Sequence, residues 1–202
     1  QRFALVLSRL LPHLRKTLSE RMVKQRLSEH TRIDVNIVDG LLNMWVRGVP
    51  ETAGTSRPLA MAVFVNPIFT DSNPKLQIDP TTFPQQFMTF LLLHKIAAII
   101  GKFALNLDLV RAVFERGTVR EWLDFNQLPL TPVNDGYALF PSWSRLADMA
   151  RLRDTLPNGA SATSDWMAVT FTPNTHLDEA LEKLSLIMKW NLVDLQSLGG
   201  RH

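Results

Sequence analysis

Apolar residues in the first thirty positions recur three and four apart, which places them on one face of a helix with 3.6 residues per turn. This stripe comprises Leu7, Leu11, Leu14, Leu18 and Met22. We therefore predict a helix over residues 3–28. Val23 and Leu27 fall off the stripe, so we expect this helix to bend or restart near residue 20.

A second helical pattern follows after a short connection. Asp34 has the side chain of an N-cap, since its carboxylate can accept hydrogen bonds from the first free amides of a helix. Apolar residues then continue at helical spacing up to Val46, and Gly48 and Pro50 end the pattern. Residues 1–50 are thus predicted to form a basic N-terminal layer of two or three helices.

Three later segments favour short β-strands. Residues 59–65 form a partly β-branched apolar run that ends at Asn66-Pro67, and residues 166–171 form another that ends before Pro173. Residues 75–79 lie between two prolines and give a possible third strand. We expect a small two- or three-stranded sheet.

The segment from Phe83 to Leu105 is apolar nearly all round, which is typical of a helix at the centre of a domain. Asn106 is placed to cap the next helix, residues 107–116. The predicted fold is α+β and helix-dominated, with about seven helices around this central apolar helix. We divide the chain into the layer 1–50 and a mixed α/β core domain over 51–202, and the alternative is one continuous domain.

The last predicted helix carries apolar residues on two sides. Its main stripe comprises Leu177, Leu181, Leu184, Met188, Leu192 and Leu195. A second row comprises Leu186, Trp190 and Val193. Either the helix is buried on both sides within one chain, or the second row is a partner interface, for example in an oligomer.

Composition narrows the class of protein. The chain has 202 residues, 46% of them hydrophobic and 20% charged, which is typical of a globular protein and excludes a disordered chain, a collagen or a coiled-coil rod. The absence of cysteine excludes disulfides and thiolate metal sites. His94 and two lysines interrupt the most apolar run, so we expect no membrane span. We also expect no signal peptide and a cytoplasmic or equivalent intracellular location.

Motifs that carry catalysis are missing. The sequence has no phosphate-binding glycine loop, no dinucleotide fingerprint, no zinc-protease pair and no nucleophile elbow. No two of its five histidines lie within five residues of each other, which leaves only a metal site assembled from distant segments. We expect no cofactor and lean towards a protein that is not an enzyme, while an enzyme with dispersed catalytic residues stays open.

The positive charge lies at the N-terminal end. Residues 1–50 hold nine Lys and Arg and four Asp and Glu, a net charge of +5, whereas the remainder is net −2. Such a surface can displace counterions from phosphates, and few aromatic residues are interleaved to stack on bases. The candidate nucleic-acid-binding residues are Arg9, Arg15, Lys16, Arg21, Lys24, Arg26 and Arg32.

The basic residues have three interpretations. They either form a solvated helix face without a binding role or belong to one of two function classes. The first is a nucleic-acid-binding or assembly subunit that contacts the nucleic-acid backbone. The alternative is a protein-only docking or scaffold subunit, in which the basic face meets an acidic protein partner.

Short stretches of the N-terminal half resemble the helical end of the bacterial primase catalytic core. They are residues 10–15 (Leu-Leu-Pro-His-Leu-Arg), 26–31 (Arg-Leu-Ser-Glu-His-Thr), 33–35 (Ile-Asp-Val) and 41–42 (Leu-Leu). The resemblance implies that a helicase-binding region follows, which is one form of the docking hypothesis. The expected strands at 59–65 and 166–171 do not suit an all-helical region, so we adopt no family and transfer no residue roles.

Overall fold

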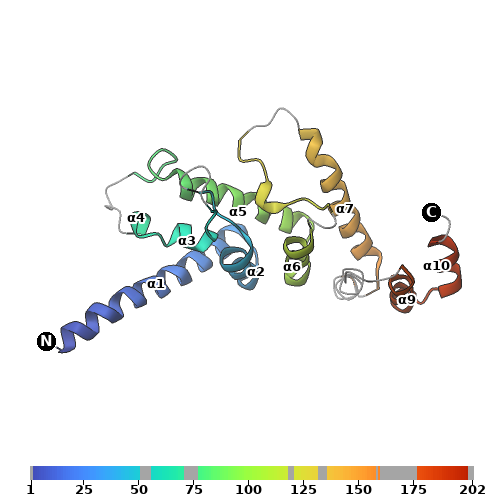
Figure 1. Cartoon of the computed structure of the whole chain (residues 1–202), viewed down its shortest axis with the longest axis horizontal. Coiled ribbons are helices and arrows are strands. Elements are labelled where there is room, and N and C mark those ends of the chain that lie inside the picture. Colours follow the sequence, from blue (N-terminus) through green and yellow to red (C-terminus); the bar gives the residue numbers. More distant parts are fainter. Residues whose placement is uncertain are drawn as a thin grey trace. The chain divides into compact units, whose positions relative to one another are not determined.

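The computed structural model describes residues 2–50, 56–70, 77–117, 121–131, 136–157, 159 and 177–199 (Figure 1). The structure is helix-dominated, 74% helical, with no β-strand in the described part. The chain forms two compact units. Unit 1 is Gln1–Lys102 with Phe125–Pro132, and unit 2 is Phe103–Asp124 with Val133–His202.

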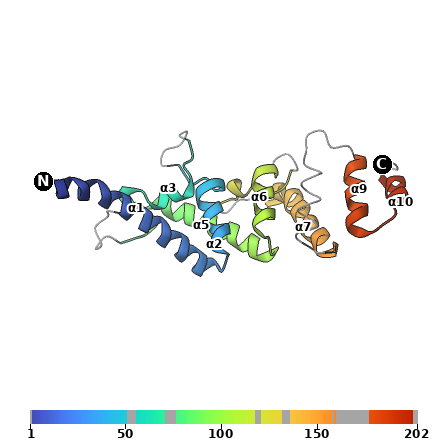
Figure 2. The ribbon, with the colours of Figure 1, turned by 90° about the horizontal axis from the view of Figure 1, so that it is seen from below.

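The helices are distributed between the two units as follows (Figures 1 and 2). Unit 1 holds α1 (Arg2–Thr31), α2 (Val35–Gly40), the π-helical turn η1 (Leu41–Trp45), α3 (Ala60–Phe64), α4 (Pro67–Thr70), α5 (Pro84–Lys102) and the 3-10 turn η2 (Phe125–Gln127). Unit 2 holds α6 (Leu107–Arg116), the 3-10 turn η3 (Gly136–Leu139), α7 (Phe140–Thr155), α9 (Leu177–Met188) and α10 (Leu192–Gly199).

The α+β prediction is wrong, because the run predicted as the first strand is helical. Residues 60–64 form α3, and the Val65 amide donates to the Met61 carbonyl at 3.0 Å, which is a helical hydrogen bond. Only Leu59 retains β-type pairing, an isolated antiparallel bridge to Arg47. Hydrophobic periodicity cannot separate a buried strand from one buried helical turn in so short a run.

The other two predicted strands give no sheet either. Residues 77–79 carry no regular secondary structure, and residues 75 and 76 lie outside the described residues. The predicted strand 166–171 also lies outside them. The described part therefore supports a mainly helical fold, and the sheet of the predicted fold class is withdrawn.

Helix α5 supplies much of the core of unit 1, as its apolar sequence predicts. Leu92 and Ile96 are fully buried and Ile99 nearly so. Helix α3 packs on α5 and on η1. Its Val63 side chain is buried and belongs to the core of unit 1. The side chain of Asn126 connects η2 to the segment that follows η1. Its amide oxygen accepts a hydrogen bond from the Arg47 backbone amide at 2.8 Å.

The turn that precedes α5 is held by the carboxylate of Asp79. The Asp79 carboxylate accepts from the backbone amides of Thr81 and Thr82 at 2.9 and 2.7 Å. The bond from the Thr82 backbone holds the pKa of Asp79 below its ordinary value, because it stabilises the charged form. Gln85 reaches away from the helix start and donates to the Val49 carbonyl at 2.8 Å. The Gln85 bond ties the beginning of α5 to the segment at Val49 of unit 1.

Helix α6 of unit 2 begins and ends where the sequence predicts. The Asn106 side chain accepts from the Leu109 amide at 3.0 Å, which confirms it as the N-cap. Leu109, Val110 and Val113 lie on one side and are buried.

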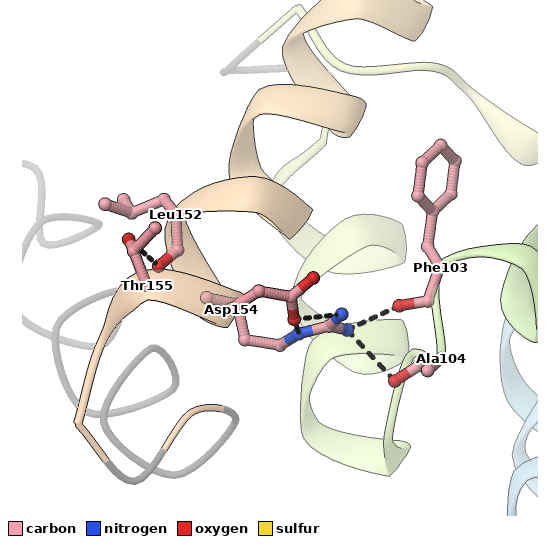
Figure 3. Close-up of polar contacts among 6 residues, drawn as sticks. Phe103, Ala104, Leu152, Asp154 and Thr155 are labelled. Atoms are coloured by element: carbon pink, nitrogen blue, oxygen red, sulfur yellow. Dashed lines mark hydrogen bonds and ion pairs between the residues drawn. The ribbon is translucent and has the colours of Figure 1, made fainter.

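One buried arginine connects α7 to the segment before α6. Arg153 is 8% exposed, and its guanidinium donates to the carbonyls of Phe103 and Ala104, the latter at 3.0 Å (Figure 3). Two further bonds, of 2.8 and 2.6 Å, reach the Asp154 carboxylate. Since Ala104 adopts a left-handed φ of 47°, these bonds hold the chain in a strained turn as it enters α6. The arrangement explains Arg153 as a structural residue of unit 2.

We expect replacement of Arg153 by Met to destabilise unit 2. The substitution keeps much of the apolar stem but removes the charged donor of the Phe103 and Ala104 carbonyls, and we expect a loss of about 1.5–3 kcal/mol, the range for a hydrogen bond to a charged group. Denaturant unfolding of the full chain measures this loss. Arg151→Met, in the same helix but with its guanidinium exposed beside Asp148, serves as the control and should change stability by under about 0.5 kcal/mol. Equal effects of the two substitutions would contradict the role of Arg153.

Candidate functional site

Helix α1 is one continuous helix of 30 residues, so it does not restart near residue 20, which was one of the two predicted outcomes there. Its C-terminal part packs against α2, α3 and α5. Leu27 is buried there and Val23 is half-buried, so these two residues form the contact face. Figures 1 and 2 both show the N-terminal part of α1 extending away from the other helices of unit 1.

The described side chains of the predicted apolar stripe, which are those of Leu11, Leu14, Leu18 and Met22, are exposed and point away from this contact face. Leu18 and Leu27 are nine residues apart, which is two and a half turns, so they lie on opposite sides of the helix. Leu14 and Val23 are related in the same way. Among the described side chains of α1, the large apolar ones that are exposed have 44% to 59% of their surface accessible, and they are Leu10, Leu11, Leu14, Leu18 and Met22. We call these five residues the α1 stripe.

The candidate basic residues do not share one face. Arg15 and Arg26 lie on the same side of α1, eleven residues or about three turns apart, and Lys16 lies one residue or about 100° further round. The side chains of Arg15, Lys16, Arg21, Arg26 and Arg32 are exposed, that of Lys24 is half-buried, and that of Arg9 lies outside the described part.

Several of these cations face carboxylates. Lys24 lies 3.0 Å from Asp39 of α2, and Arg26 lies 3.0 Å from Glu29. Lys16 and Glu20 are 4.0 Å apart. Such exposed pairs contribute little to stability, yet they reduce the positive potential along the side that bears Lys16 and Lys24.

Arg32 has a backbone role beside its charge. It follows the last residue of α1 with a left-handed φ of 58°, and its amide donates to the Ser28 carbonyl at 2.8 Å. This is the geometry of a helix C-terminal turn. It reverses the chain so that Asp34 caps α2, where the Asp34 carboxylate accepts from the Asn36 amide at 2.7 Å, as predicted for an N-cap.

That reversal creates a cleft between α1 and α2, with a volume of about 410 Å³. Two of the predicted basic residues, Arg21 and Lys24, come together in it. The other lining residues are Gln25, Val35, Asn36 and Asp39. Sequence reasoning missed these four, because no spacing rule links α1 to α2 across the turn. The Asp34 capping signal locates the start of α2 but does not indicate which of its residues face α1.

The structure also brings two distant histidines together. The rings of His30 and His94 have centroids 5.9 Å apart, and Phe90 lies beside both. Nowhere in the described ranges do three or more potential metal ligands gather. We interpret the cluster as an aromatic contact between α1 and α5.

The predicted partner interface is divided between two helices and the segment that connects them, with Leu186 in α9, Trp190 in the connection and Val193 in α10. Lys189, with a φ of 56°, breaks the predicted C-terminal helix between α9 and α10. The three interface candidates remain exposed, with accessible fractions of 70% for Leu186, 53% for Trp190 and 69% for Val193. Burial of this second row within the described part of one chain does not occur.

No protein-family model, curated protein or solved structure matches the chain. Among the described helices, none combines the length and the apolar character needed to cross a membrane.

Proposed function

We propose that this protein is a docking module that binds a partner protein through the α1 stripe. The observation that carries this proposal is that α1 is anchored by Val23 and Leu27 while its more apolar face stays exposed. A contiguous apolar surface on a folded protein marks a recognition site more often than a scattered exposed leucine does. Amphipathic helices bind partner grooves with side chains at this three- and four-residue spacing.

The charge of α1 defines the chemistry of the partner. The helix contains seven Lys and Arg against two Glu, a net charge of +5. Arg15 flanks the α1 stripe on one side and Arg21 interrupts it near its C-terminal end. An apolar groove with an acidic rim complements both features, since opposite charges at a rim speed association and exclude wrong partners. This favours the docking-subunit alternative, with an acidic protein as partner.

A synthetic acidic helix tests this docking surface directly. A peptide of about 28 residues, with Leu at the a and d positions and Glu at e and g, presents the complementary pattern. We expect it to bind the full chain, and Leu14→Glu to weaken binding about tenfold or more, because the substitution places a carboxylate in the apolar contact. Titration with a fluorescent peptide measures the affinity.

His13→Glu is the matched control for Leu14→Glu. Both residues are exposed neighbours in α1, and each substitution adds one negative charge, but His13 lies off the α1 stripe. The control should retain nearly the affinity of the unmodified chain. Equal loss in the two variants would show that charge alone drives the contact, and absence of peptide binding would refute the docking surface.

Contact with the nucleic-acid backbone is the second candidate, and the net charge of α1 together with the exposure of Arg15, Lys16 and Arg26 favours it. Lysines and arginines that neutralise phosphates release counterions, so affinity falls steeply with salt. This mode needs no apolar stripe and leaves the exposure of Leu14 and Leu18 unexplained. We therefore rank it below protein docking.

Charge reversal separates this second candidate from docking. If α1 binds phosphates, Arg15→Glu with Arg26→Glu should flatten the slope of log affinity against log salt by about one unit per lost contact. The control pair is Arg111→Glu with Arg151→Glu, on α6 and α7 of unit 2. Fluorescence anisotropy with a labelled duplex and a labelled single strand gives the slopes. No binding at low salt, or equal losses in both pairs, rules out this mode.

A further inference from the structure

We propose that the cleft between α1 and α2 is a binding site for a phosphate group. The cleft contains none of the five apolar residues of the α1 stripe, although Arg21 borders both surfaces, and the proposal goes beyond the docking function proposed above. Two of the candidate basic residues, Arg21 and Lys24, share this cleft with neutral hydrogen-bond donors.

Arg21 is the main ligand of the proposed site. Its side chain is exposed and makes no ion pair with any described residue, so its guanidinium is available to an incoming anion. A guanidinium offers a planar fork of donors that pairs with two phosphate oxygens at once. Asn36 and Gln25 add amide groups at the cleft wall. Gln25 already donates one amide hydrogen to Glu29 at 3.0 Å, which leaves its second one.

Lys24 and Asp39 set the charge of the cleft. They lie 3.0 Å apart, and Asp39 also accepts from the Asn43 amide at 2.8 Å. With Arg21, the lining therefore carries two cations and one carboxylate, a net charge of +1. The carboxylate opposes an anion, so its removal should tighten binding while loss of Arg21 should weaken it. Opposite effects of two neighbouring residues are characteristic of an anion site.

The size of the cleft fits a phosphate attached to a larger group. Its volume of about 410 Å³ lies within the range of small-molecule pockets, and Val35 provides an apolar wall. A phosphate monoester carries close to two negative charges at neutral pH, more than a carboxylate, and thus gains more from Arg21 and Lys24. A phosphorylated side chain, a free nucleotide and a nucleic-acid backbone all supply this chemistry.

Titration of the isotope-labelled full chain with inorganic phosphate tests the site, with chloride at matched ionic strength as reference. We expect saturable amide shifts confined to residues 21–25 and 35–39. Arg21→Gln should weaken binding about tenfold or more, since a charged hydrogen-bond donor is lost. Arg26→Gln, on the same helix and outside the cleft, is the control and should leave affinity unchanged. Asp39→Asn should tighten binding severalfold, because it removes the opposing charge.

Competition then identifies the source of the phosphate. A phosphoserine peptide, a nucleoside monophosphate and a single-stranded oligonucleotide are each added to the phosphate-bound protein, and the one that displaces phosphate at the lowest concentration is the natural class. Shifts that do not saturate, equal weakening by Arg21→Gln and Arg26→Gln, or weaker binding by Asp39→Asn would each overturn the proposal. The α1 stripe is not part of this site, so Leu14→Glu should leave phosphate binding intact even if peptide docking fails.

Discussion

The packing of one face of α1 determines which surfaces this protein exposes. Leu27 is buried and Val23 half-buried against the rest of unit 1, and that contact turns the more apolar side of the helix outward. Burial of a leucine side chain contributes about 1.5–3 kcal/mol, so the anchoring face has a clear energetic basis despite its few residues. The exposed face then retains apolar surface that a partner can bury, and the same anchoring positions α2 beside α1 to form the basic cleft.

Local signals in the sequence predict several elements correctly because their causes are local. Asn106 and Gly117 bracket α6, and the Asp34 cap of α2 is present as expected. The apolar run that contains Leu92 and Ile96 predicts a buried helix because a helix that is apolar all round has no face for water. In each case the decisive contacts lie within one or two helical turns.

The sequence-based predictions are wrong or incomplete where tertiary contacts determine the local structure. The run from Leu59 to Val65 is apolar enough for a strand. In the structure it instead forms the short helix α3, which packs on α5 and η1. The α1 stripe is recognisable from spacing, yet spacing does not indicate whether Leu18 or Leu27 faces the core. The cleft depends on the turn at Arg32, which brings Asn36 and Asp39 to Arg21, and no sequence rule pairs residues across such a turn.

The absence of cysteine from the chain allows a direct measurement of the orientation of α1. Single variants Leu18→Cys and Leu27→Cys each introduce one thiol, and the rate of its reaction with a maleimide reports its exposure without background labelling. The orientation described here predicts rapid labelling at position 18 and labelling at least about tenfold slower at position 27, where reaction requires local opening. Protection at position 18 with rapid labelling at position 27 would show that the stripe is the packed face, and would contradict the account.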